Sequence, residues 1–333
     1  LIDQILNLDN QRRSLQAKTN EMQAEMNKLS KDIGMLFKSG EQEKAMQVKE
    51  QTTNIKKELE ALEMELQQSS AGLHELLIQV PNIPHPSVPA GKSDADNREI
   101  RSGGALPKLE EGAMPHWDLA KKYKLIDFEL GVKISGGGFP VFRGQGARLQ
   151  RALISWFLDQ NIKAGYEEVL PPLLVNEASG FGTGNLPDKE GQMYHVTAEN
   201  LYLIPTAEVP VTNIYRDMIL DAEDLPVKNT AYTPCFRREA GSYGKDVRGL
   251  NRVHQFDKVE IVHIEHPSRS YQALEEMVSH VEELIVKLGL PYRIVELCGG
   301  DLSFTSALTY DFEVFSAAQD KWLEVSSVSN FES

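Results

Sequence analysis

The 333-residue chain is 41% hydrophobic and 25% charged, which is typical of a soluble globular protein with about two domains. Its net charge of -14 excludes attraction of the whole surface to nucleic acid, because affinity for phosphate depends on clustered Lys and Arg. The two cysteines, Cys235 and Cys298, have no His or Cys neighbours at ligand spacing, which excludes a disulfide framework and predicts a cytoplasmic location. No apolar run approaches the ~18 residues of a membrane span, so no membrane association is expected.

Apolar residues in the first 80 positions recur at alternating steps of four and three, which is the heptad pattern of packed helices. The pattern stops at residues 38–41 and then resumes, so it predicts two helices that fold back on each other as a long antiparallel coiled-coil hairpin. The predicted seam consists of Leu1, Ile5, Leu8, Arg12, Leu15, Thr19, Met22, Met26, Leu29, Ile33, Leu36, Ala45, Val48, Thr52, Ile55, Leu59, Leu62, Leu66, Ser69, Leu73, Leu76 and Val80.

The distal half of this hairpin, residues 18–57, is locally basic. It carries eight Lys and six Asp or Glu, so its net charge is +2 where the whole chain has -14. A positive tip favours contact with a phosphate backbone. A dimerisation or spacer element stays an alternative, because solvated helix faces also mix both signs.

Residues 81–115 contain six of the sixteen prolines and predict a linker between a first domain, 1–80, and a second domain, 116–333. In the second domain, helices are predicted at 147–161 and 268–288, the latter followed by a terminating Gly289. Strands without alternating helices predict an α+β fold, with an antiparallel sheet flanked by helices. The strands are expected at 167–172, 201–205, 230–239, 250–264, 309–315 and 321–328.

A glycine-broken, charged stretch joins two of these strands: FRREAGSYGKDVRGLNRVHQFDKVE, residues 236–260. Three glycines, Gly241, Gly244 and Gly249, predict a pliable loop that could fold over a ligand. Such a cover, beside paired arginines and carboxylates, suits a triphosphate and a small cationic metabolite.

Alternation along the predicted strands places charged side chains together, because residues two apart share a face. Arg237 and Glu239 are expected to point the same way, with Arg238 pointing away. Charges that face water at a sheet edge stay an alternative. The other expected faces are Arg252, His254, Phe256, Lys258 and Glu260 in one strand, and Trp322, Glu324 and Ser326 in another.

The stretch LIPTAEVP, residues 203–210, predicts a stiff turn that presents a hydroxyl and a carboxylate between two prolines. The carboxylate of Glu208 could receive an ammonium group. In the alternative interpretation, Thr206 caps a helix that starts near Glu208, and both roles are compatible.

These motifs, in this order and together with the hairpin, resemble the seryl-tRNA synthetase family of the bacterial type over essentially the whole chain. The resemblance implies a class II catalytic domain, a homodimer, and a helical arm that binds tRNA(Ser), with tRNA(Sec) expected from the family. It implies the ATP-dependent activation of L-serine in the presence of Mg²⁺, followed by transfer of the seryl group to tRNA. A paralogue that loads a carrier protein and a non-catalytic coiled-coil interaction protein are the alternatives.

The resemblance also implies site residues, and the stretch 236–260 then corresponds to the second signature motif of class II. Thr206, Ala207, Glu208 and Glu260 resemble the residues that bind serine, with Glu260 accepting the serine hydroxyl. Arg237 resembles the arginine that holds the α-phosphate, and Glu239 resembles the acceptor for the adenine amino group. The remaining residues expected to bind ATP are Arg238, Val253, Glu324, Val325, Ser326 and Ser327. Of these, Glu324 and Ser327 are expected to bind Mg²⁺. The residues expected to be catalytic are Arg237, Glu239 and Glu324.

Residues 147–172 resemble the first signature motif, which implies a dimer interface. The third signature motif, with an arginine for the γ-phosphate, is expected beyond Ser333 and is not in this sequence. We therefore expect residues to be missing at both ends of the chain, which begins with Leu1.

Overall fold

The computed structural model describes residues 1–240 and 248–332. The chain divides into two compact units, Leu1–Pro81 and Asn82–Ser333. Of the three glycines predicted to make a pliable loop, Gly241 and Gly244 lie outside the described residues.

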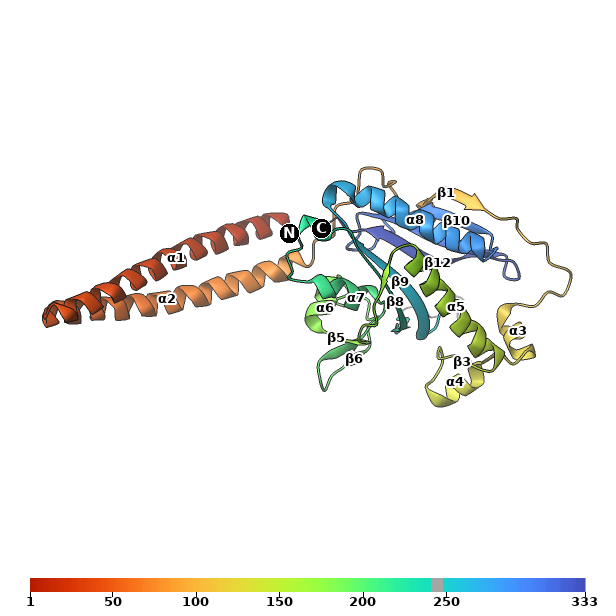
Figure 1. Cartoon of the computed structure of the whole chain (residues 1–333), viewed down its shortest axis with the longest axis horizontal. Helices are drawn as coiled ribbons and strands as arrows, with labels where there is room; N and C mark the ends of the chain where they lie inside the picture. The colour runs from red at the N-terminus through yellow and green to blue at the C-terminus, as the bar shows by residue number, and fades with distance from the viewer. Residues whose placement is uncertain (241–247, 333) are drawn as a thin grey trace. The chain divides into compact units, whose positions relative to one another are not determined.

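The first unit is a pair of long helices, α1 (Ile2–Lys38) and α2 (Gln42–Leu77), which run antiparallel (Figure 1). The connection contains Gly40 with φ +81°, a conformation that glycine adopts without strain. Every residue of the predicted seam except Leu1 is buried or half-buried, so the predicted hairpin is confirmed. The hydroxyl of Ser69 donates to the carbonyl of Leu8, which joins the end of α2 to the beginning of α1.

A four-stranded antiparallel sheet forms one layer of the second unit, in the order β1-β10-β11-β12. Helix α8 (Ser270–Lys287) covers one face of it, and Gly289 follows with φ +69°, as predicted. The core between helix and sheet includes Phe312, Ile294 and Val278, which are fully buried. The strands are β1 (Arg98–Gly103), β10 (Tyr292–Glu296), β11 (Leu308–Ser316) and β12 (Lys321–Asn330).

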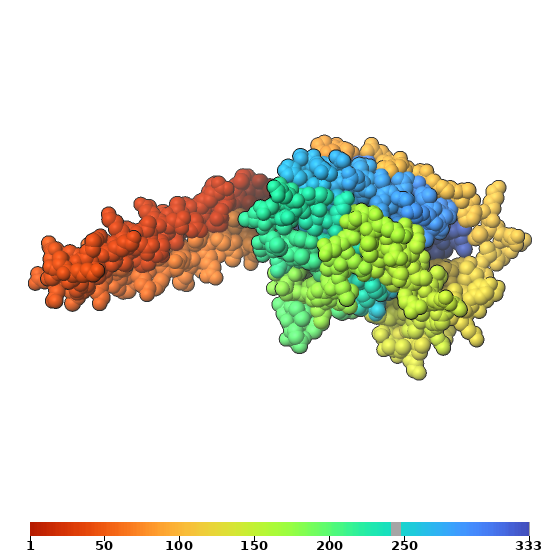
Figure 2. Space-filling model, viewed as in Figure 1, coloured from red at the N-terminus to blue at the C-terminus, as the bar shows by residue number. Residues whose placement is uncertain are grey.

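A second sheet contains β4 (Glu167–Glu168), β8 (Val227–Phe236) and β9 (Gln255–Ile264), in that order. Helix α5 (Gln145–Lys163) packs on it and lies beside α8 on the same face of the unit, as the space-filling view shows (Figure 2). Strand β8 pairs antiparallel with β9 but parallel with β4, so this sheet is mixed, whereas the sequence predicted an antiparallel one.

Smaller elements complete the second unit around these two layers. They are the helices α3 (His116–Lys122), α4 (Phe128–Ile134), α6 (Glu177–Gly182) and α7 (Glu208–Thr212), the paired strands β2 (Ile126–Asp127) and β3 (Val141–Phe142), the sheet β5-β7-β6 (Leu174–Asn176, Leu201–Leu203, His195–Val196), and 3-10 turns at Asp94–Asp96, Asn213–Tyr215, Ala222–Asp224 and Pro267–Arg269.

Several details differ from the expectation. Strand β10 was not predicted, and β9 begins at Gln255, so Arg252 and His254 lie before the strand to which they were assigned. Strand β1 lies within the range 81–115 that was predicted to be a linker, and it pairs with β10. The predicted strand 167–172 is reduced to two residues, because the prolines at 171 and 172 cannot continue a ladder. The predicted strand 230–239 ends at Phe236.

Both cysteines are fully buried and unpaired with each other. Among the described helices, none combines the length and the apolar character that crossing a membrane requires.

Candidate active site

The turn after β7 is joined to β9 by a side-chain hydrogen bond. Thr206 is buried, and its hydroxyl donates to Glu260 Oε2 at 2.8 Å. The same hydroxyl oxygen accepts the backbone N–H of Glu208 at 3.2 Å, where α7 begins. One Thr206 hydroxyl therefore contacts both the start of α7, where Ala207 is the N-cap residue, and the carboxylate of β9.

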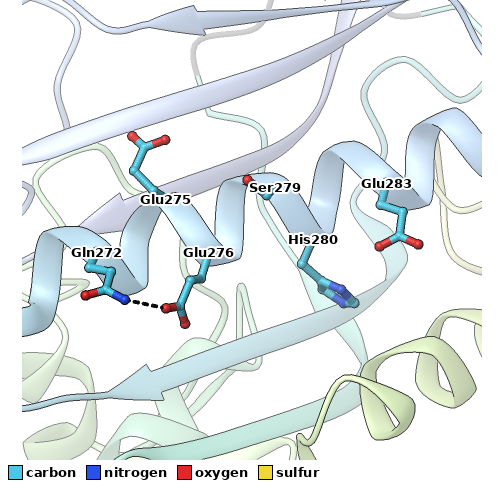
Figure 3. A pocket seen from close by; sticks show the side chains of 6 residues that line it. All are labelled: Gln272, Glu275, Glu276, Ser279, His280 and Glu283. Atoms are coloured by element: carbon cyan, nitrogen blue, oxygen red, sulfur yellow. Dashed lines mark hydrogen bonds between the residues drawn. The ribbon is translucent and has the colours of Figure 1, made fainter.

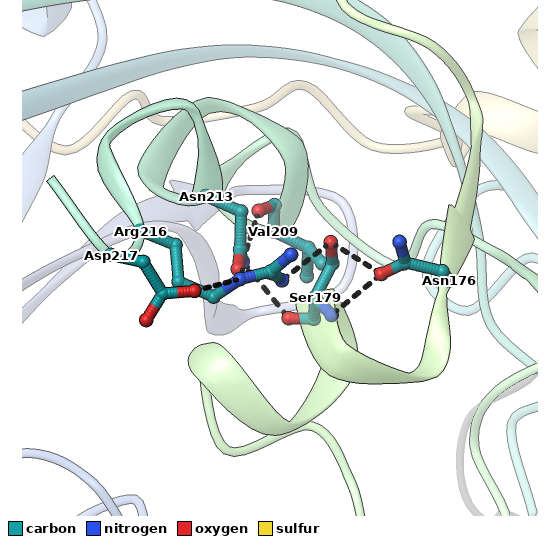
Figure 4. Close-up of polar contacts among 6 residues, drawn as sticks. All are labelled: Asn176, Ser179, Val209, Asn213, Arg216 and Asp217. Carbon is teal, nitrogen blue, oxygen red and sulfur yellow. Dashed lines mark hydrogen bonds and ion pairs between the residues drawn. The ribbon is translucent and has the colours of Figure 1, made fainter. Parts of the chain in front are cut away.

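A polar network behind α7 holds this turn in place (Figure 4). The amide of Asn213 donates to the carbonyls of Val209 and Ser179 at 2.8 and 2.9 Å. Arg216 Nη1 donates to Ser179 Oγ and to Asn213 Oδ1 at 3.1 and 2.8 Å. Since Ser179 belongs to α6 and Val209 to α7, the network fixes the two short helices to each other, and with them the position of Glu208.

Arg237 follows the end of β8 and is held from three sides. Its backbone N–H donates to the carbonyl of His254 at 3.0 Å. Its Nε donates to the carbonyl of Pro205 at 3.4 Å, and its guanidinium lies 5.1 Å from the centre of the Phe256 ring. These contacts place a fixed cation beside the Thr206 turn.

The carboxylates of this region are crowded. Glu260 Oε2 pairs with Lys258 Nζ at 2.9 Å, because the two side chains share one face of β9, as predicted. Burial raises the pKa of Glu208 to about 7, and the nearby charge of Glu260 adds to this, while Lys258 and Arg237 act in the opposite direction. A desolvated carboxyl group beside a second carboxylate favours a cationic ligand, which would restore its ionised form.

Glu239 occupies a left-handed backbone position with φ +50° and accepts a hydrogen bond from Arg252 Nη1 at 3.2 Å. The prediction that Arg237 and Glu239 point together relied on strand alternation, and that argument fails here because β8 has already ended. Arg238 is exposed, its backbone N–H donates to the carbonyl of Gln192, and its guanidinium lies towards Gly191.

Strand β12 contains a bulge that changes which of its residues share a face. Glu313 pairs with Glu324 and Phe312 pairs with Ser326, so Val325 is the extra residue. Directly opposed residues share a face, and Phe312 points into the core under α8. The predicted grouping of Glu324 with Ser326 is therefore wrong, because Ser326 lies on the core side.

Beyond the bulge, Ser327 lies on the same face as Glu324, opposite Asp311. Burial and the charge of Glu324 raise the pKa of Asp311 to about 7, and its Oδ1 is buried without a hydrogen-bond partner among the described residues. Partial desolvation also raises the pKa of Glu324, an exposed residue of β12, although Arg237 opposes this. Two carboxylates and a hydroxyl on one face are the oxygen ligands that Mg²⁺ prefers, so these residues fit a hard cation.

None of the predicted site residues lines the hollow of about 470 Å³ on the outer side of α8 (Figure 3). Its acidic side chains are engaged: Glu275 pairs with Arg101, Glu276 with Lys228, and Glu283 with Lys287. Within the described part of the chain, no group of three or more His, Cys, Asp or Glu residues has the arrangement of a metal site.

The sequence did not single out Asp311. Alternation in the predicted strand 309–315 was the available signal, since it places Thr309, Asp311 and Glu313 on the face opposite the apolar residues. The structure brings together Thr206, Glu208, Arg237 and Glu260 by direct contacts or charge, with Glu324 within electrostatic reach of Arg237.

Comparison with known families matches both units. The family model "Seryl-tRNA synthetase N-terminal domain" matches residues 1–84, and "tRNA synthetase class II core domain (G, H, P, S and T)" matches residues 194–333. The serine--tRNA ligase of Salinibacter ruber is 49% identical over 332 residues, which cover 100% of this chain and 78% of that protein. The serine--tRNA ligase of Geobacter sulfurreducens is 48% identical over 327 residues, which cover 98% of this chain and 76% of that protein.

Solved structures agree. The seryl-tRNA synthetase of Pyrococcus horikoshii, complexed with ATP, has a TM-score of 0.85 and 35% identity, covering 99% of this chain and 79% of that one. The cytoplasmic serine-tRNA ligase of Naegleria fowleri, in complex with AMP, has a TM-score of 0.81 and 28% identity, covering 99% and 76%. A relative is 49% identical over this whole chain, and the two family models match its first and last parts. The chain therefore belongs to the seryl-tRNA synthetase family.

Proposed function

We propose that the protein is a serine--tRNA ligase, which activates L-serine with ATP and transfers the seryl group to tRNA(Ser). The observation that carries this proposal is the pairing of Thr206 with Glu260 beside Glu208 and Arg237, which sets two carboxyl groups next to a fixed guanidinium. An amino acid carries an ammonium and a carboxylate, so both halves of this site have a matching group on the substrate.

Serine binding is assigned to Thr206, Ala207, Glu208 and Glu260. Glu208 would pair with the substrate ammonium, which offsets the cost of its buried charge. Glu260 Oε2 is already occupied by Thr206 and Lys258, and its other oxygen would accept the serine hydroxyl. Alanine would leave that carboxylate oxygen without a partner, which gives the site its selectivity.

ATP binding is assigned to residues 237–239, Val253, Glu324, Val325 and Ser327, without Ser326, which lies on the core side of β12. Arg237 would hold the α-phosphate, because its guanidinium is fixed on Phe256 and Pro205. Glu239 would accept the adenine amino group. For Mg²⁺ we propose Glu324 and Ser327 as ligands, since the β12 bulge puts both on the face of Asp311. When bound, Mg²⁺ would offset the negative charge of the phosphates.

In the reaction, a serine carboxylate oxygen forms a bond to the α-phosphorus and the bond from that phosphorus to pyrophosphate breaks. No side chain takes part covalently. The chain contributes position and charge: Glu208 and Glu260 orient serine, and Arg237 stabilises negative charge on the α-phosphate. A hydroxyl of the terminal adenosine of tRNA then forms a bond to the carbonyl carbon of the seryl adenylate, the bond from that carbon to the phosphate oxygen breaks, and AMP leaves with the phosphate oxygen.

The helical hairpin is the proposed tRNA-binding arm. All eight lysines of residues 18–57 are exposed, and only Lys44 and Lys56 form ion pairs among the described residues. The other six remain available for phosphates. A structure of tRNASec in complex with the seryl-tRNA synthetase of M. kandleri shares the fold at a TM-score of 0.58 and 18% identity.

A homodimer is proposed through α5 and the residues after it. In α5 and the residues after it, Leu149, Ile162 and Leu170 are 58%, 46% and 88% exposed, and a partner that covered them would bury apolar surface. Leu149 also lines a hollow of about 460 Å³, together with Ala152, Leu153, Trp156, Lys287 and Leu288. Sedimentation velocity of Leu149→Glu should show a loss of dimer, whereas an unchanged mass would contradict this interface.

A charging assay tests the proposed function against its alternative. The protein is incubated with ATP, labelled serine and either tRNA(Ser) or an acyl carrier protein. Serine attached to tRNA through an alkali-labile ester supports the proposal. Serine attached to the carrier thioester alone, with no charged tRNA, would assign the chain to a carrier-loading paralogue.

A further inference from the structure

Two side chains from distant parts of the sequence hold the segment that leads into the proposed ATP contacts. His116, the first residue of α3, accepts the backbone N–H of Leu250 on Nε2 at 2.8 Å. Gln319, in the β11–β12 turn, accepts a hydrogen bond from Asn251 Nδ2 at 2.9 Å and itself donates to Ser316 at 2.9 Å. Consecutive residues of the segment are thus fixed from two directions.

The approach of α3 to this segment is close enough to require glycine. Gly249 has φ +67°, and a Cβ atom there would lie 2.1 Å from His116 Nε2. Any side chain would both strain the backbone and displace the imidazole. The neighbouring residue takes part as well, since the guanidinium of Arg248 lies 5.9 Å from the centre of the Trp117 ring.

The anchored segment runs directly into the nucleotide site. Arg252 donates to Glu239, the proposed acceptor for adenine, and Val253 is buried. The next residue, His254, is fixed by its N–H to the carbonyl of Gly138 at 2.7 Å, and its carbonyl accepts the N–H of Arg237. A shift of residues 250 and 251 would therefore reach Glu239 through Arg252.

We propose that His116 and Gln319 are positioning residues for ATP: they hold residues 250–251 so that Arg252, Glu239 and Val253 form the nucleotide site before ATP arrives. This inference rests on the proposed function and deepens it. His116 acts as an acceptor, so its Nε2 carries no proton in this arrangement. Without the anchors only a fraction of molecules is competent to bind, and the apparent affinity for ATP falls by that fraction.

The test compares His116→Ala with His116→Gln, whose amide oxygen can still accept an N–H. Loss of one hydrogen bond should raise KM for ATP about five- to tenfold, with kcat and KM for serine within twofold of the unaltered protein. His116→Gln should recover most of the affinity. Gln319→Ala should repeat the pattern, and Gln319→Glu, which keeps an acceptor, should be close to the unaltered protein.

Equilibrium titration of ATP by calorimetry accompanies the kinetics, and thermal unfolding shows that each variant is folded. The inference is overturned if His116→Ala binds ATP as the unaltered protein does, or if ATP and serine affinities fall together. An unaltered protein that binds ATP but never activates serine would contradict the proposed function, while the titration would still decide the role of His116.

Discussion

Replacing Glu208 by Gln should stabilise the folded chain at high pH and weaken serine binding, so the two contributions of this side chain can be measured separately. The pKa of Glu208 is raised to about 7 in the folded chain, chiefly by burial, from the ordinary value of 4.5. The folded state therefore holds this proton more tightly than the unfolded state. The stabilisation is fully present below pH 4.5 and is lost as the pH rises through 7.

Because each pKa unit represents about 1.4 kcal/mol, this pKa difference should lower the free energy of unfolding by about 3 kcal/mol as the pH rises from 5 to 8. Glu208→Gln is neutral at every pH and has the shape of the protonated acid. It should be more stable than the unaltered chain at pH 8 by up to about 3 kcal/mol, or roughly 6 to 12 °C in Tm, and nearly equal to it at pH 5.

The same substitution should weaken serine binding at least tenfold, because the ammonium group loses its charged partner. Differential scanning calorimetry at both pH values, and serine titration at pH 8, measure the two effects. Glu168→Gln is the control, since Glu168 is an exposed carboxylate of β4. Equal Tm differences at pH 5 and pH 8 would refute the argument for a desolvated Glu208, and unchanged serine affinity would refute its role in binding.

Three further predictions concern the site and the arm. Arg237→Ala should lower adenylate formation at least a thousandfold, measured by pyrophosphate exchange, whereas Arg238→Ala, whose side chain lies towards Gly191, should lower it far less. Glu324→Gln should raise the Mg²⁺ concentration needed for half-maximal ATP binding severalfold, in a titration at fixed ATP. Replacing both Lys28 and Lys31 by Gln should leave pyrophosphate exchange unchanged and weaken tRNA binding. It should also reduce the slope of log affinity against log salt by about one for each phosphate that the arm no longer binds. Equal losses in exchange and in tRNA charging would contradict the separate roles of arm and site.

The hairpin could be predicted almost residue by residue, because heptad spacing is a local property and a seam residue must be buried wherever its helix packs. Leu59 and Leu73 were placed by spacing alone and are buried in the structure. The longer strands and the helices α5 and α8 were predicted for the same reason, since their periodicity is continuous over many residues.

Features that depend on contacts between distant residues could not be predicted. The bulge at Val325 has no local signature, yet it decides that Ser327 and not Ser326 shares a face with Glu324. Prolines on both sides of β1 favoured the prediction of a linker there, and the strand is defined only by its pairing with β10. His116 and Leu250 are 134 positions apart, so their contact exists only in the folded chain.

The most direct test of the account is serine-dependent exchange of labelled pyrophosphate into ATP, with alanine and threonine as competing substrates. It is run on the 333-residue chain and on the same chain extended by the C-terminal segment of a relative that is longer than this sequence. Exchange that requires serine, and that Glu260→Ala reduces, is the predicted result. A folded, extended protein that shows no exchange with serine, or equal exchange with alanine, would contradict the assignment of this site to serine activation.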